Sequence, residues 1–227
     1  MNITDTKIGI LAVTAEGAAK TYRDMHIAFY DKFGAYNNPT ITMTMHPLID
    51  HVNNFGDKNK WVLLIQKGID DLIDQNVDLI CMPANSSHLV IDEIDFKDVP
   101  FINMVEEAVN HLKNTTKNTL ILGTKISLSE SLYLKNLPAN CFVPKTDDIE
   151  KLNEIIVKEM VLGKLSETSR SFILNMIEEN QKAHNIEHLF FACTELPCFF
   201  NNRDLPLPTL DSIQLLIKKV LTQCLET

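Results

Sequence analysis

The stretch that decides the fold is Val77-Asp78-Leu79-Ile80-Cys81-Met82-Pro83-Ala84-Asn85-Ser86-Ser87-His88, in which a short apolar run ends in a polar loop. A second stretch of the same form stands in the other half of the chain, His188-Leu189-Phe190-Phe191-Ala192-Cys193-Thr194-Glu195-Leu196-Pro197. A short apolar run bounded by turn residues is typical of a buried strand. Open α/β sheets place their ligand sites in the loops at the carboxyl ends of such strands. The two loops therefore predict two half-sites that face each other and hold a small molecule.

Segments typical of strands and of helices alternate along the whole chain. Strands are predicted at 7–13, 41–45, 79–82, 100–104, 119–123, 141–143 and 190–191, and helices at 16–33, 58–74, 147–161, 166–184 and 212–225. This alternation predicts an α/β fold with parallel sheets that are covered on both faces. Because the segments form two series of similar length, we expect two similar lobes, each a mainly parallel sheet flanked by helices, with an active-site cleft between them. The first lobe is expected to contain residues 1–103 and 208–227, and the second residues 104–207.

Composition and charge restrict the class of protein. The chain of 227 residues is long enough to bury a sizeable core, and its 45% hydrophobic and 22% charged residues are ordinary for a globular protein. The net charge of -9 argues against partners such as nucleic acid or an anionic membrane surface. No apolar run approaches the roughly 20 residues of a membrane span, and the first residues lack the pattern of a signal peptide. We therefore expect a cytoplasmic protein.

The five cysteines have irregular spacing. None forms a Cys-x-x-Cys pair, and no histidine lies at the spacing of a zinc ligand from any of them. This pattern predicts reduced cysteines and no metal site. The cysteines are Cys81, Cys141, Cys193, Cys198 and Cys224.

The two loops resemble the paired half-sites of the cofactor-independent aspartate/glutamate racemase family, each of which normally carries a cysteine. Here Cys193 stands in one loop and Ala84 stands where the other thiol would be, so the chain resembles a one-cysteine branch of that family. The resemblance covers nearly the full length. It includes the opening strand and turn at 8–16 (where Ala12, Val13 and Ala15 replace the usual glycines), the threonine-containing loop at 122–127, and the closing segment at 208–212.

The resemblance implies an amino-acid racemase that needs no pyridoxal phosphate and forms a homodimer. Its substrate would be an amino acid or a dicarboxylic acid. Cys193 would take the α-proton on one face, and His88, a serine hydroxyl or water would act on the other, because Ala84 cannot transfer a proton. The resemblance also implies contacts between the substrate and seven further residues, namely Thr14, Asn85, Ser86, Thr124, Ser127, Lys164 and Thr194.

Several of these residues also have an ordinary structural interpretation. His88 could cap the following helix or lie buried in the wall, and Ser127 is a natural helix cap. Lys164 could be a solvated surface lysine, and Asp211 or Ser212 is expected to cap the final helix.

Two other functions remain open from the sequence. A single-cysteine enzyme of this fold could decarboxylate malonate-like acids, since one thiol is enough to protonate the resulting enolate. The chain could also bind a carboxylate without catalysis, in which case it would bind a ligand tightly and exchange no α-proton.

Overall fold

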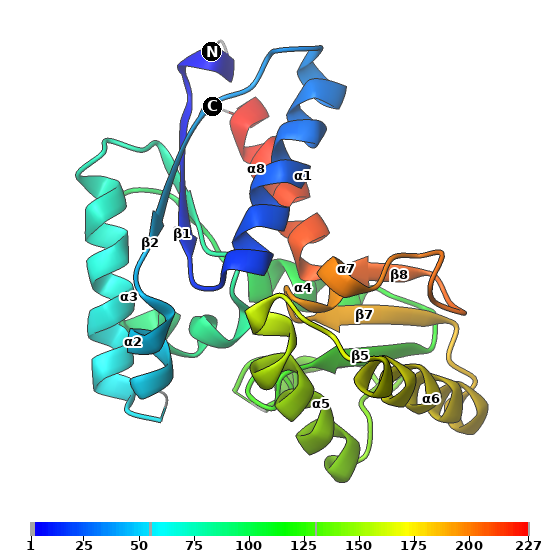
Figure 1. The fold of residues 1–227 in the computed structure, drawn as a ribbon. Helices are drawn as coiled ribbons and strands as arrows, with labels where there is room; N and C mark the ends of the chain where they lie inside the picture. Colours follow the sequence, from blue (N-terminus) through cyan, green and yellow to red (C-terminus); the bar gives the residue numbers. More distant parts are fainter. Residues whose placement is uncertain (1–2, 55, 130, 227) are drawn as a thin grey trace. The chain divides into compact units, whose positions relative to one another are not determined.

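The computed structural model describes residues 3–54, 56–129 and 131–226, and Figure 1 shows the order of the elements along the chain. The contacts within the chain divide it into two units. The first unit comprises Met1–Met104 and Leu215–Thr227, and the second comprises Val105–Gln214. Among the described residues, no helix is long and apolar enough to cross a membrane.

The first unit contains a parallel sheet of four strands in the order β2-β1-β3-β4. In Figure 1, α1 and α8 lie on one side of β1 and β2, and α3 lies on the other. The elements from the amino terminus are the 3-10 helix η1 (Ile3–Asp5), β1 (Lys7–Ala12), α1 (Ala15–Phe33), β2 (Thr40–Met45), α2 (Leu48–Asn53), α3 (Lys58–Ile73), β3 (Leu79–Cys81), the 3-10 helix η2 (Asn85–Glu93) and β4 (Phe101–Ile102).

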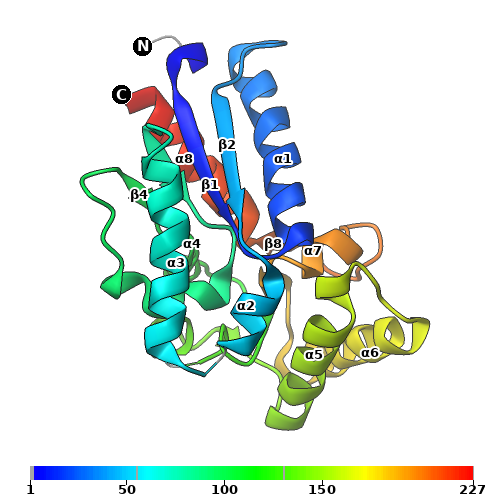
Figure 2. The same cartoon turned by 60° about the vertical axis from the view of Figure 1, so that its left-hand side comes forward.

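The second unit contains another parallel sheet of four strands, in the order β6-β5-β7-β8. Figure 2 shows its helices α5 and α6 from a second direction. The elements are α4 (Met104–Lys113), β5 (Thr119–Gly123), η3 (Leu134–Asn136), β6 (Cys141–Phe142), α5 (Thr146–Lys158), η4 (Met160–Leu162), α6 (Glu167–His184), β7 (His188–Ala192), α7 (Leu196–Phe199) and β8 (Thr209–Asp211), followed by α8 (Ser212–Glu226), which continues into the first unit. These elements confirm the predicted α/β fold of two similar lobes, each a parallel sheet flanked by helices.

The apolar runs of the sequence form the central strands β1, β3, β5 and β7, which are buried, whereas β2 at the edge of the first sheet is exposed or half-buried along its length. Every residue of β5 is buried, and in β1 only Lys7, the first residue of the strand, is exposed. The helices are amphipathic instead: α3 buries Trp61, Ile65, Ile69 and Leu72 and leaves Leu63 exposed. A continuous apolar strand beside helices with one apolar face is the pattern expected of a covered parallel sheet.

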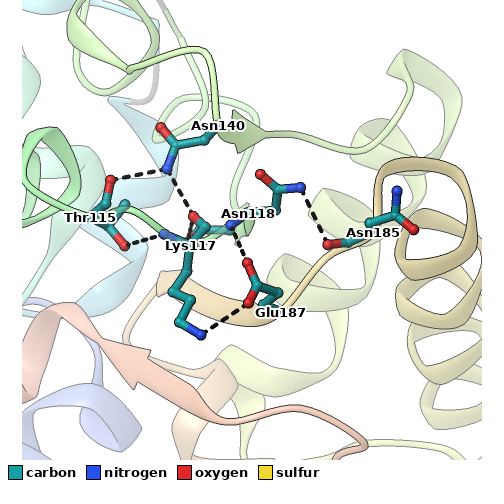
Figure 3. Close-up of polar contacts among 7 residues, drawn as sticks. Thr115, Lys117, Asn118, Asn140, Asn185 and Glu187 are labelled. Atoms are coloured by element: carbon teal, nitrogen blue, oxygen red, sulfur yellow. Dashed lines mark hydrogen bonds and ion pairs between the residues drawn. The ribbon is translucent and has the colours of Figure 1, made fainter.

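Polar side chains tie together the amino ends of the strands in the second sheet (Figure 3). The Asn118 backbone N–H donates to Glu187 Oε2 at 3.2 Å, and Lys117 Nζ lies 3.0 Å from the other oxygen of that carboxylate. Hydrogen bonding with Lys117 is the main cause that lowers the pKa of Glu187. Asn140 Nδ2 donates to the Lys117 carbonyl oxygen at 2.9 Å. These bonds connect the segments that enter β5, β6 and β7, and so hold the three strands in register.

The boundaries of the two units differ in part from the division expected from the sequence. That division assigns residues 208–227 to the first lobe, whereas β8 pairs with β7 in the second sheet and the first unit resumes at Leu215. The difference arises because the three-residue strand β8 lies directly after Pro208 and is too short and too polar to be recognised by its pattern. The division into lobes at the residues expected from the sequence stays a prediction.

Candidate active site

The predicted site residues follow the carboxyl ends of strands within their own unit. In the first unit, Thr14 follows β1, and Ala84, Asn85 and Ser86 follow β3. In the second unit, Thr124 and Ser127 follow β5, and Cys193 and Thr194 follow β7. Lys164 is the exception, because it lies in the turn between η4 and α6.

The Cys193 thiol is the central group of the second-unit loop. Its side chain is buried, and its Sγ donates to Oε2 of Glu195 at 3.1 Å. The backbone N–H groups of Glu195 and Leu196 also donate to this sulfur. Cys193 therefore combines an acceptor for its proton with two donors that stabilise a sulfur anion.

The resting form of Cys193 is the thiol. Burial is the largest cause that raises its pKa, and the negative charge of Glu195 and its hydrogen bond raise it further. The backbone N–H groups of Leu196 and Glu195 act in the opposite direction, but the pKa remains well above the ordinary value of a cysteine. A thiolate is the reactive species of cysteine, so this thiol must lose its proton before it can act as a base.

Three further groups complete the surroundings of Cys193. Thr194 Oγ1 donates to the same Oε2 of Glu195 at 3.1 Å, and Cys198 Sγ donates to the carbonyl oxygen of Thr194 at 3.3 Å. Tyr133 is fully buried, and burial followed by the nearby charge of Cys193 raises the pKa of its hydroxyl above the usual range. The tyrosine hydroxyl is consequently neutral at physiological pH.

Gly123 brings β5 and β7 close together beside the thiol. It pairs with Ala192, and a Cβ at position 123 would lie 2.8 Å from the Ala192 carbonyl oxygen. The residues that come next, Thr124 and Cys193, therefore start from neighbouring backbone positions. Thr124 Oγ1 lies 2.9 Å from Ser127 Oγ and accepts from the Ser127 backbone N–H at 3.1 Å. Thr124 thus caps the turn, the role that the sequence analysis considered for Ser127.

Lys164 is exposed at the end of a turn whose backbone is held by hydrogen bonds. Gly163 adopts a left-handed conformation with φ 72°, and the Lys164 backbone N–H donates to the Glu159 carbonyl oxygen at 3.1 Å. The Glu159 carboxylate accepts from the Ser166 backbone N–H at 2.7 Å and from Ser169 Oγ at 2.5 Å. These bonds fix the backbone of the turn, while the ammonium group extends into solvent.

The first-unit loop presents polar groups but has no thiol at its tip. Ala84 is 7% exposed and precedes η2 in extended conformation with φ -154°. Asn85 and Ser87 are buried, and Ser86 is half-buried. Amide and hydroxyl groups of this kind suit a carboxylate, which accepts hydrogen bonds.

His88 lies in the wall of the first unit with both ring nitrogens engaged. Its Nδ1 lies 3.0 Å from the Ala84 carbonyl oxygen, and its Nε2 accepts from the Met104 backbone N–H at 3.2 Å. Because an acceptor at Nε2 leaves the proton on Nδ1, the ring is neutral and donates to Ala84. Burial lowers the pKa of His88 to about 4. This arrangement favours the structural interpretation of His88 over proton transfer.

Two residues beside the thiol were not among the site residues predicted from the sequence. One is Glu195, whose side chain is buried and contacts the thiol itself. A glutamate two positions after a strand-end cysteine was the available signal. The other is Gly123, the last residue of β5. Among the described residues, no cluster of three or more His, Cys, Asp or Glu side chains could hold a metal ion.

Comparison with known proteins places these loops in a family. The family described as Asp/Glu/hydantoin racemase matches residues 8–220. The chain is 24% identical over 222 residues to the broad specificity amino-acid racemase RacX of Bacillus subtilis (strain 168), which covers 95% of this chain and 96% of that protein.

Solved structures show the same fold. An aspartate racemase homologue from Pyrococcus horikoshii OT3 is 26% identical with a TM-score of 0.73, over 96% of this chain and 99% of that one. The aspartate racemase of Picrophilus torridus is 21% identical with a TM-score of 0.74, over 96% and 94% of the two chains, and so resembles this chain in fold. Since the family match spans nearly the whole sequence and includes both strand-end loops, the chain belongs to the Asp/Glu/hydantoin racemase family.

Proposed function

We propose that the protein is a cofactor-independent amino-acid racemase of the aspartate/glutamate type, in which the thiolate of Cys193 removes the α-proton. The observation that carries this proposal is the buried thiol at the end of β7, which has an acceptor for its proton and two backbone N–H donors on its sulfur. The similarity to a broad specificity amino-acid racemase supports the same class of reaction.

The remaining site residues have two roles in this proposal. Thr14, Asn85, Ser86, Thr124, Ser127 and Thr194 bind the polar groups of the substrate. Lys164 binds a side-chain carboxylate, because an ammonium group on a fixed turn attracts a second negative charge. The substrate is therefore an amino acid or a dicarboxylate, with aspartate and glutamate as the first candidates.

The face of the substrate's α-carbon that is opposite Cys193 needs a proton donor other than a thiol. Ala84 has no ionisable group, and His88 is held by two backbone bonds. We infer that a hydroxyl group, from a serine of the first-unit loop or from water, delivers the proton there. A hydroxyl is a poor carbon base at neutral pH, so the two enantiomers are expected to react at unequal rates. The homodimer and the cytoplasmic location expected from the sequence stay predictions.

The test is incubation in D₂O with each enantiomer of aspartate and glutamate, with α-proton loss followed by NMR and handedness by chiral chromatography. Exchange with inversion supports the racemase, and Cys193→Ser should abolish it. Exchange without inversion would indicate a one-base site. Absence of exchange with all four amino acids would exclude this proposal. A single-thiol decarboxylase, the alternative that one cysteine allows, would then release CO₂ from a malonate-like acid.

A further inference from the structure

The helix α7 is a single turn that begins three residues after the thiol. The Cys198 backbone N–H donates to the Glu195 carbonyl oxygen at 2.9 Å, and the Phe200 backbone N–H donates to the Leu196 carbonyl oxygen at 3.0 Å. A single turn fixes several backbone angles in exchange for few hydrogen bonds, so a helix this short is not stable by itself in water. Contacts from outside the turn must therefore hold it together.

The amino end of α7 is bonded to the thiol. The side chain of Glu195, the residue at the N-cap position, makes no capping bond. The backbone N–H groups of Glu195 and Leu196 donate instead to the sulfur of Cys193. Since the first N–H groups of a helix have no partner within it, the sulfur takes the part of the cap. The stabilisation of a sulfur anion at Cys193 consequently depends on whether α7 is formed.

The carboxyl end of α7 is held by Arg170, a half-buried residue of α6. Arg170 Nη2 donates to the Phe199 carbonyl oxygen at 3.2 Å, and its Cζ lies 4.9 Å from the centre of the Phe200 ring. The last carbonyl oxygens of a helix have no partner within it, and a guanidinium group over an aromatic ring is attracted to it. One side chain thus bonds the backbone of the turn and packs on the ring that follows it.

Arg170 itself is fixed independently of α7. It lies near the start of α6, which Ser166 caps by accepting from the Ser169 backbone N–H at 3.2 Å. The Arg170 backbone N–H donates to the Ser166 carbonyl oxygen at 2.8 Å. Further along the helix, Ile173 and Ile177 are buried in the apolar cluster that also contains Cys193. A helix of 18 residues therefore supports one of four.

We propose that Arg170 is a positioning residue that keeps α7 formed and thereby holds the N–H groups of Glu195 and Leu196 on the sulfur of Cys193. This inference rests on the proposed function, in which that sulfur is the base. Arg170 acts on the thiol only through α7, from the opposite end of the turn.

The test compares Arg170→Met with Arg170→Lys and with a matched control, Lys182→Met, on the exposed face of the same helix. The first measurement is amide hydrogen exchange of the peptide that contains α7, read by mass spectrometry. The second is the rate at which iodoacetamide alkylates Cys193 as a function of pH, and the third is kcat and KM for aspartate racemisation. Circular dichroism melting checks that each variant is folded.

The expected results follow from the loss of the contacts at the carboxyl end. In Arg170→Met, the amides of Cys198 and Phe200 should exchange about fivefold faster or more, because the turn opens more often. The sulfur then loses its N–H donors for part of the time, which disfavours the thiolate. The alkylation midpoint should therefore move up by about half a pH unit or more. Glu195 and Tyr133, whose charges interact with that of Cys193, are the same in every variant.

Turnover should change in the same order. In Arg170→Met, kcat should fall about tenfold with little change in KM, because the base is displaced whereas the proposed substrate contacts lie outside α7. Arg170→Lys retains a charged donor without the planar fork, so it should recover part of each effect. Lys182→Met should behave as wild type in all three measurements.

Three outcomes overturn the inference. Wild-type hydrogen exchange of α7 in Arg170→Met would mean that the turn does not need Arg170, even if the alkylation midpoint moved. Faster exchange with an unchanged alkylation midpoint would mean that the donors to the sulfur do not depend on the turn. An unchanged kcat despite both shifts would exclude a positioning role in turnover. A wild-type protein that exchanges no substrate α-proton overturns the proposed function, whereas hydrogen exchange and alkylation, which need no substrate, still decide whether Arg170 holds α7 on the thiol.

Discussion

Replacement of Gly123 by alanine tests whether the close approach of β5 and β7 positions the thiol. A Cβ at this position would lie 2.8 Å from the Ala192 carbonyl oxygen, 3.2 Å from its carbonyl carbon and 3.3 Å from its Cβ. Ordinary contact begins at 3.4 Å, so the two strands would have to separate by several tenths of an ångström. The atoms in the way are mostly backbone, which cannot rotate aside.

The expected cost follows from these contacts. Overpacking of a rigid site destabilises by about 1–3 kcal/mol, and the lower entropy of the unfolded alanine variant returns about 0.4–1 kcal/mol. The net loss of about 1–2 kcal/mol corresponds to a fall in melting temperature of about 3–6 °C for a chain of this size. Because Cys193 follows Ala192 directly, we also expect about a tenfold loss of kcat, since a displacement of about 1 Å can cost 100-fold.

Gly9→Ala in β1 is the matched control. The new Cβ there would meet Val77 Cγ2 at 3.2 Å and Leu72 Cδ1 at 3.3 Å, which are ends of side chains that can adjust. We expect a change within about 0.5 kcal/mol, because the packing and unfolded-state effects nearly cancel. Thermal and urea unfolding measure stability, and α-proton exchange in D₂O measures activity. Equal stability of the two variants, with an unchanged kcat for Gly123→Ala, would refute the reasoning.

Three further predictions concern individual side chains. Ala84→Cys supplies a second thiol. In D₂O the ratio of inversion to simple exchange should therefore rise at least about fivefold for the slower enantiomer. An unchanged ratio would mean that position 84 does not face the reacting carbon. Lys164→Met should raise KM for aspartate about fivefold to tenfold, as expected for loss of a solvated ion pair of about 1 kcal/mol. It should leave KM for alanine unchanged. An equal rise for both amino acids would exclude a contact between Lys164 and the side chain of the substrate. Burial lowers the pKa of His88 from 6.5 to about 4, so this residue contributes stability that is present above pH 6.5 and decreases by about 3 kcal/mol as the pH falls to 4. His88→Gln should flatten this part of the curve of unfolding free energy against pH, and a slope equal to that of wild type would contradict the assignment.

The strands and helices could be predicted because they depend on local pattern. The apolar run at 119–123 is the observed β5, and the helix predicted at 58–74 is α3 (Lys58–Ile73) within one residue. Short elements were missed for the same reason. The helix α2 has six residues and α7 has four, which is too few for a helical repeat to be visible.

The site could be predicted only as far as the strand ends. The sequence indicated that Cys193 follows a buried strand, but the hydrogen bond between its sulfur and Glu195 depends on how the loop turns back. The same holds for His88, whose partner at Nε2 is the backbone N–H of Met104. The local sequence around His88 does not reveal this partner, because Met104 lies further along the chain. The bond to Met104 nevertheless decides whether the histidine is free to transfer protons.

The equal strand orders of the two sheets, β2-β1-β3-β4 and β6-β5-β7-β8, make β3 and β7 equivalent positions within one chain. Ala84 therefore occupies in the first unit the kind of position that Cys193 occupies in the second. Two half-length chains made from one gene would have identical sequences and could not differ in this way. A codon change in that gene would alter both chains. Encoding both halves in one gene allows the two loops to carry different residues, alanine after β3 and a thiol after β7, so the two positions can come under separate selection.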